Sequence, residues 1–153
     1  VSFMGDNNRP VLFLDVDGVL CLAGSGLYCL PEKRTLHPPA VAHLKQLLEE
    51  TNACVVVSSS WRKKKNSLEL LKKRLEEEGG IPVDFDRVTP VVEKKKRDEE
   101  IVAWLREQGY NENEIQWAVL DDSENKMGGS EAKVVRQHLV VVRSSIGFSD
   151  VTC

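Results

Sequence analysis

This 153-residue sequence lacks an excess of positive charge, paired cysteines and long apolar runs. Its net charge of −3 excludes the strong overall basicity of non-specific nucleic-acid binders, so any basic surface must be local. The four cysteines stand at irregular spacings, with no Cys-x-x-Cys pair and no histidine spacing typical of a zinc site. We therefore expect a reducing, intracellular location, first of all the cytoplasm, with the nucleus not excluded.

No apolar run approaches the roughly 20 residues that a membrane-spanning helix needs, and residues 1–10 lack the pattern of a signal peptide. A membrane partner is therefore not expected. With 41% hydrophobic residues, the chain is long enough for one ordinary hydrophobic core. We expect residues 11–153 to form one domain and residues 1–10 to be disordered or derived from cloning.

Short apolar runs rich in β-branched residues alternate along the chain with helical patterns. The predicted strands are 11–16, 53–57, 117–120 and 139–142, and the predicted helices are 38–50, 67–78 and 98–108. This alternation predicts an α/β fold in which a mainly parallel sheet lies between helices on both faces. The polar segment 122–130 is expected to be a loop.

Carboxylate and hydroxyl side chains directly follow three of the predicted strands. They are Asp15 and Asp17, Ser58 and Ser59, and Asp121 and Asp122. Because sites in open α/β sheets form at the carboxyl ends of strands near a topological switch point, we expect these side chains to share one site. Carboxylates are ligands that Mg²⁺ takes together with water and phosphate oxygens, so the aspartates predict a magnesium site. Hydroxyls and backbone N–H groups after the second strand suit phosphoryl oxygens.

Basic residues adjoin these segments. Lys96 and Arg97 stand at the start of the third predicted helix, where a cation would offset phosphate charge, and Arg62 follows the second strand. Basic clusters occur at 62–65, 72–74 and 94–97. On a chain of negative net charge, cations beside the site favour an extended polyanionic substrate, because each phosphate contact adds attraction.

Four segments, in the right order, resemble the motifs of the haloacid dehalogenase (HAD) superfamily. VLFLDVDGVL at 11–20 resembles the first motif, and VVVSSSWR, KKKRDEEIVAWL and AVLDDS resemble the second, third and fourth. More narrowly, SSSWR, an arginine before an Ile-x-x-Trp-Leu helix, and LDD resemble the HAD-type domains of Swiss Army Knife RNA repair proteins. The resemblance implies a Rossmann-like three-layer sandwich, a single HAD-like catalytic domain over 11–153, and magnesium-dependent phosphatase activity.

The resemblance also implies roles for the first-motif aspartates. Asp15 would be the nucleophile that forms an aspartyl-phosphate, and Asp17 the general acid and base. Both would take part in binding Mg²⁺, Asp17 through its backbone carbonyl, together with Asp121 or Asp122.

Two further roles have two candidates each. Counting from the strand end makes Ser58 the phosphate-binding hydroxyl, whereas alignment on Trp61 favours Ser59. Either Lys96 or Arg97 would supply the cation of the third motif. Arg62 is an additional candidate contact for the substrate phosphate.

The spacing between the motifs leaves little room for a cap domain, because the gap after the first motif has about twenty residues, and the stretch from 61 to 94 is mostly accounted for by one helix and a short strand. An uncapped site would accept a phosphate carried on a macromolecule. We therefore expect a large phosphorylated substrate, first an RNA or DNA end and second a phosphoprotein. A small-metabolite phosphatase or phosphomutase is the alternative, and a non-enzymatic binding module comes last.

Overall fold

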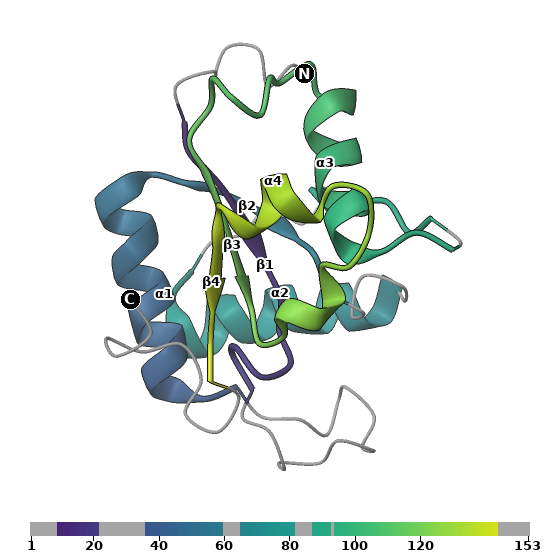
Figure 1. Ribbon diagram of the computed structural model, residues 1–153. Helices are drawn as coiled ribbons and strands as arrows, with labels where there is room; N and C mark the ends of the chain where they lie inside the picture. Colours follow the sequence, from purple (N-terminus) through teal and green to yellow (C-terminus); the bar gives the residue numbers. More distant parts are fainter. Residues whose placement is uncertain (1–8, 22–35, 60–64, 82–86, 93, 144–153) are drawn as a thin grey trace.

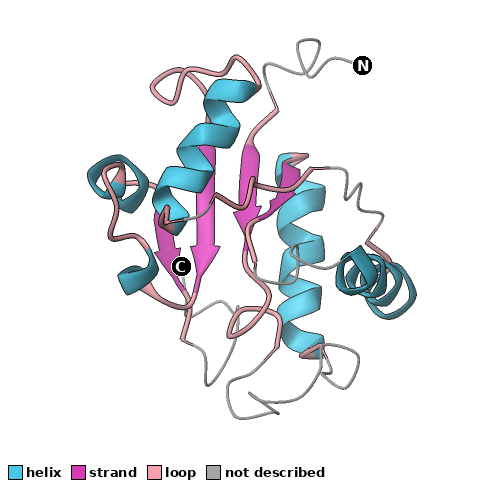
Figure 2. Cartoon of the chain, turned by 90° about the vertical axis from the view of Figure 1, so that its right-hand side faces the viewer, coloured by secondary structure: helices cyan, strands magenta, loops and turns pink. Residues whose placement is uncertain are grey.

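The computed structural model describes residues 9–21, 36–59, 65–81, 87–92 and 94–143. Within these ranges the chain forms one four-stranded parallel sheet between two layers of helices (Figure 1). Figure 2 shows the strands in the middle of the molecule with helices around them. The Rossmann-like three-layer architecture predicted from the sequence is confirmed.

The sheet has the order β2-β1-β3-β4, and every neighbouring pair is parallel. The strands are β1 (Val11–Leu14), β2 (Cys54–Val57), β3 (Trp117–Asp121) and β4 (Leu139–Val141). Residue Val11 of β1 pairs with Cys54 on one side and with Trp117 on the other. Since β1 has its successor on one side and β3 on the other, the topological switch point lies at the carboxyl ends of β1 and β3.

Two helices cover each face of the sheet. The helices are α1 (Pro38–Thr51), α2 (Lys65–Gly79), α3 (Arg97–Glu107) and α4 (Ala132–Arg136), and a 3₁₀ helix, η4, spans Glu124–Lys126. Residues of α1 and α2 share one buried cluster with alternate residues of β1, and residues of α3 and α4 share the other. The side chains of β1 therefore point into both layers, which explains why this strand is continuously apolar.

The two buried clusters differ in composition. On the α1/α2 face, Leu14 packs in an aliphatic cluster with Leu44 and Leu71. On the α3/α4 face, the ring of Phe13 meets Trp104 and Trp117 edge to face, with centroids 5.6 Å and 5.9 Å apart. Edge-to-face contacts of this kind stabilise a core beyond the apolar area that they bury. Trp104 is thus a packing residue.

Local signals explain where α1 and α3 begin and end. Helix α1 starts with two prolines, and it ends at Asn52, whose left-handed backbone (φ 54°) lets its N–H donate to Leu48 O at 2.8 Å. Helix α3 starts after Lys96, and its first turn carries Asp98, Glu99 and Glu100, which favour a helix N-terminus electrostatically.

Three local expectations need correction or addition. The segment 122–130 is not entirely loop, because it contains η4. Helix α4 was not predicted, since its five residues are too few to show a helical apolar period. The short strand expected between 61 and 94 is reduced, among the described residues, to a single parallel bridge between Val57 and Val88. No helix in the described ranges has the length and hydropathy that crossing a membrane requires.

Candidate active site

The segment after β1 forms a tight turn at the carboxyl edge of the sheet. The N–H of Asp15 donates to Leu120 O at 3.0 Å, which continues the pairing with β3 by one residue. The carbonyl of Val16 then accepts hydrogen bonds from the N–H groups of Leu20 and Cys21, at 2.9 Å and 3.1 Å. This turn holds the side chain of Asp15 beside the end of β3.

Three carboxylates meet at this edge. One oxygen each of Asp15, Asp121 and Asp122 lie within 4.8 Å of one another. Asp15 and Asp121 are 2% and 1% exposed, and Asp122 is partly exposed. Gly18 makes the approach of Asp122 possible, because a Cβ at this position would overlap its carboxylate, and the backbone there is left-handed (φ 82°).

Two cations neutralise much of this cluster. Arg97, at the first position of α3, has Nη1 3.3 Å from Asp121 Oδ2 and 3.8 Å from Asp15 Oδ1. Its Nε lies 3.8 Å from Glu100 Oε1, and its Nη1 also donates to the carbonyl of Ser58. The guanidinium is therefore held from three elements of the fold.

The second cation, Lys126 of η4, was not predicted. Its Nζ lies 3.1 Å from Asp15 Oδ2, 3.2 Å from Asp121 Oδ1 and 3.0 Å from Asp122 Oδ1. The one signal in the sequence was its position four residues after Asp122. This spacing brings the lysine back to the carboxylate only because the residues between them form a 3₁₀ turn, and the sequence did not predict that turn.

Burial and neighbouring charge change the acidity of the cluster. Burial, and next the charge of Asp121, raise the pKa of Asp15 from 3.8 to about 7, although Lys126 and Arg97 oppose the increase. Burial also raises the pKa of Asp121. Burial acts in the same direction on Asp122, but the hydrogen bond and charge of Lys126 outweigh it, so the pKa of Asp122 is lowered.

The two serines after β2 differ in their surroundings. Both are buried, and the N–H of Ser58 donates to Leu14 O at 2.8 Å, which ties it to the end of β1. Among the described residues, Ser58 Oγ is the buried side-chain oxygen with no hydrogen-bond partner. A buried hydroxyl without a partner costs free energy, so a ligand oxygen at this position would relieve it.

The other predicted residues are Lys96, Asp17 and Arg62. Lys96 is exposed, and its backbone N–H donates to Glu99 Oε1 at 3.1 Å while its carbonyl accepts from the N–H of Glu100 at 3.1 Å. The structure brings Arg97, and not Lys96, into the cluster. Asp17 is partly buried, and a backbone bridge links it to Cys21, but its carboxylate is not part of the group of three. Arg62 lies outside the described residues.

The three gathered carboxylates fit a magnesium ion. They supply hard oxygen donors from two neighbouring strand ends, and such a partial set suits Mg²⁺, which keeps several waters or phosphate oxygens in its octahedron. The donor set contains no sulfur or imidazole that would favour a softer metal.

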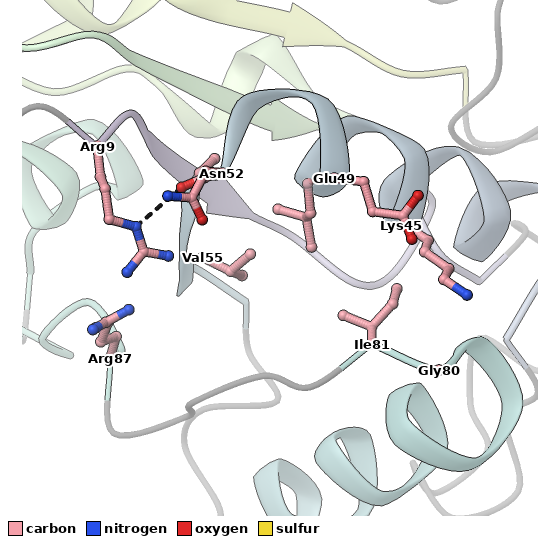
Figure 3. Close-up of a pocket in the computed structure, with 10 residues that line it drawn as sticks. Arg9, Lys45, Glu49, Asn52, Val55, Gly80, Ile81 and Arg87 are labelled. Carbon is pink, nitrogen blue, oxygen red and sulfur yellow. Dashed lines mark hydrogen bonds between the residues drawn. The ribbon is translucent and has the colours of Figure 1, made fainter.

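A cavity of about 440 Å³ lies at the other edge of the sheet, where β1 and β2 begin (Figure 3). Arg9 and Arg87 lie at one end of it and Lys45 at the other, with Val55 and Ile81 between them. It contains none of the aspartates described above. The three gathered carboxylates and this cavity therefore lie at opposite ends of the strands.

Comparison with protein families finds a match over most of the chain. The model of the family described as "HAD domain in Swiss Army Knife RNA repair proteins" matches residues 11–153. A comparison with curated proteins finds no match.

Proposed function

Because the chain belongs to the family of HAD domains in Swiss Army Knife RNA repair proteins, we propose that it is a magnesium-dependent phosphomonoesterase with Asp15 as its nucleophile. The observation that carries the proposal is the position of Asp15. This buried carboxylate lies at the switch point of the sheet, with two further carboxylates and two cations within 4.8 Å. Buried carboxylates with raised pKa values that share counter-ions are typical of catalytic sites.

The first chemical step transfers the phosphoryl group to the protein. A carboxylate oxygen of Asp15 forms a bond to phosphorus in line with the leaving oxygen, and the bond between phosphorus and the leaving oxygen breaks. Asp17 donates its proton to that oxygen, so the leaving group departs as an alcohol. The product is an aspartyl-phosphate on Asp15.

The second step releases the phosphate. Asp17, now ionised, takes a proton from a water molecule as the water oxygen attacks phosphorus. The bond between phosphorus and the Asp15 oxygen then breaks, which gives inorganic phosphate and restores both carboxyl groups. Asp17 lies in the turn that follows β1, two residues after the nucleophile, so one segment carries both functions.

Charge on the transferring group must be offset by groups fixed in advance. Arg97 is suited to this role because Asp121, Glu100 and the Ser58 carbonyl hold its guanidinium. The hydroxyl of Ser58 would donate to a phosphoryl oxygen, since its Oγ has no partner within the described residues. Ser58 and Arg97 are therefore our assignments for the phosphate-binding hydroxyl and cation.

Asp15, Asp121 and Asp122 would hold the magnesium ion, with the backbone carbonyl of Asp17. When bound, Mg²⁺ supplies positive charge that stabilises the transferring phosphoryl group and orients it.

The substrate that we propose is a phosphorylated nucleic-acid end, with RNA first. Two points support this choice: the matched family is named for RNA repair proteins, and the sequence places basic clusters beside the site segments. The exposed Lys94, Lys95 and Lys96 immediately precede the helix that carries Arg97, where they would attract a polyanion.

The test is phosphate release by the purified chain with Mg²⁺ from RNA and DNA oligonucleotides phosphorylated at the 3′ or 5′ end, phosphopeptides and sugar phosphates. Asp15→Asn, nearly isosteric and a poor nucleophile, is the matched control against contaminating phosphatases. We expect release from an oligonucleotide end that Asp15→Asn reduces by at least about 10³-fold. Equal activity of wild type and Asp15→Asn would refute the mechanism, and release from phosphopeptides alone would refute the substrate.

A further inference from the structure

Lys126 occupies the centre of the carboxylate group. Its Nζ lies 3.0 to 3.2 Å from one oxygen each of Asp15, Asp121 and Asp122. It donates hydrogen bonds to Asp15 and Asp122 and forms an ion pair with Asp121. We propose that Lys126 and a divalent cation compete for these three carboxylates, so that the lysine sets the metal affinity of the site. This inference rests on the proposed function in one respect: that function is the reason for choosing Mg²⁺ as the metal.

The two cations cannot use the carboxylates at the same time. Magnesium binds oxygen at 2.0 to 2.1 Å, whereas the three carboxylate oxygens lie 3.0 to 3.2 Å from the ammonium nitrogen. The oxygens must therefore draw together to bind the metal, and the ammonium, within hydrogen-bond distance of all three, lies in the space into which they contract. Like charge adds to this conflict, because both cations would lie in a poorly solvated site.

Lys126 can move away from the carboxylates more easily than Arg97 can. The side chain of Lys126 is 36% exposed, extends from a three-residue 3₁₀ helix and has a flexible four-carbon stem. Arg97 is 12% exposed, lies in the first turn of an eleven-residue helix and is also held by Glu100 and Ser58. A cation entering the group therefore displaces the lysine and leaves the arginine in place.

The exchange has a consequence for the reaction. Replacing an ammonium by a divalent ion raises the positive charge beside Asp15, where a phosphate dianion must bind. The released ammonium stays at the rim of the same site, because its backbone in η4 is four residues from Asp122. One event thus frees the nucleophile from its ion pair with Lys126 and increases the charge that attracts the substrate.

The first measurement is calorimetric titration of the full chain with Mg²⁺, and with Mn²⁺ as a second probe. Lys126→Gln should bind each metal at least tenfold more tightly than wild type, because the competing charge is gone. In EDTA the same variant should melt at a lower temperature than wild type, since three carboxylates lose their partner, and saturating Mg²⁺ should more than restore it. Lys133→Gln, which removes an exposed lysine of α4, is the matched control and should change neither value.

A second measurement uses the wild-type chain and does not depend on how a variant folds. Amine acetylation followed by mass spectrometry should modify Lys126 several times faster with saturating Mg²⁺ than in EDTA, while Lys133 reacts at one rate in both. Equal or weaker metal binding by folded Lys126→Gln, or labelling of Lys126 that Mg²⁺ does not accelerate, would overturn the competition. Tight metal binding without phosphate release from any substrate would end the proposed function and leave the competition standing.

Discussion

The carboxyl edge of the sheet buries its charged groups against one another, whereas the amino edge arranges them around a cavity. At the carboxyl edge, Asp15 and Asp121 are almost fully buried and share Arg97 and Lys126 as counter-ions. At the amino edge, Arg9, Arg87 and Lys45 line a cavity of about 440 Å³, where exposed Glu49 is the carboxylate.

This difference favours the buried carboxylates over the cavity as the site of the proposed chemistry. Burying a carboxylate costs several kcal/mol unless partners offset it, so a fold that keeps two of them in its interior gives up stability at that place. Among the described residues that line the amino-edge cavity, the carboxylate, Glu49, remains exposed to water, so no buried carboxylate carries this cost there. The electrostatic cost of the buried carboxylates favours the carboxyl edge as the site of the proposed reaction.

After the loss of the Asp15 carboxylate itself, the largest effect that we expect separates two adjacent basic residues. Arg97→Gln should lower kcat for oligonucleotide phosphate release by about 10²- to 10³-fold, or about 3 to 4 kcal/mol of transition-state stabilisation. The reason is that Arg97 is the cation fixed beside both Asp15 and Asp121. Steady-state kinetics with saturating Mg²⁺ measures this loss.

Lys96→Gln is the matched control, because it removes the neighbouring positive charge from an exposed side chain at the start of the same helix. We expect its kcat to stay within about threefold of wild type, as for most exposed charges. Similar losses in the two variants would mean that net charge near the helix start matters and that the buried geometry of Arg97 does not. Circular dichroism on both variants shows whether the fold is kept.

An intermediate effect concerns stability against pH. In EDTA, the free energy of unfolding of wild type should fall relative to that of Asp15→Asn as pH rises from 5 to 7. The pKa of Asp15 is raised from 3.8 to about 7, so between these values the folded protein holds a proton that the unfolded chain has released. The stability from this proton is fully present below pH 3.8 and is lost as pH rises through about 7.

The expected loss between pH 5 and 7 is about 2 kcal/mol, because a pKa difference of one corresponds to about 1.4 kcal/mol. Urea denaturation at several pH values measures it, and subtracting the Asp15→Asn curve removes the titration of distant groups. Parallel curves for the two proteins would show that Asp15 ionises as easily as an exposed aspartate. The edge would then lack the electrostatic cost that distinguishes it from the amino edge.

The sequence predicted the frame of the site well because short-range patterns specify it. The four strands are apolar runs long enough to recognise, and parallel pairing brings the residues after them to one edge, so the meeting of Asp15 with Asp121 and Asp122 follows from topology. The choice between Ser58 and Ser59 could not be made in this way. It depends on which hydroxyl lacks a partner, and packing decides that.

The cations were harder to predict because their positions depend on turns. Lys96 and Arg97 are adjacent and both basic, and only the exact start of α3 turns Arg97 toward the carboxylates. Lys126 reaches the site through the 3₁₀ turn of η4, in a segment expected to be loop. A long side chain that folds back over a turn produces no periodic pattern in a sequence, so Lys126 was missed although it lies among the three carboxylates.

The smallest effect that we expect is at the amino-edge cavity. A substitution there tests whether this end of the sheet takes no part in the reaction. Lys45→Gln should leave kcat and KM for phosphorylated oligonucleotides within about twofold of wild type. The two ends of a four-residue strand are roughly 10 Å apart, which is about one Debye length at 0.1 M salt, so an exposed charge at one end acts weakly on a phosphate at the other.

Glu49→Gln removes a negative charge from the same cavity and is therefore the control of opposite sign. It should leave kcat and KM for the same substrates equally unchanged. The informative alternative is a split between substrates. If Lys45→Gln raises KM for a long oligonucleotide but not for p-nitrophenyl phosphate, and Glu49→Gln lowers it, the strand of a bound polyanion extends from the carboxyl edge to the amino edge. The cavity would then belong to substrate binding, because its cations would contact phosphates remote from the reacting one and add to the salt dependence of affinity.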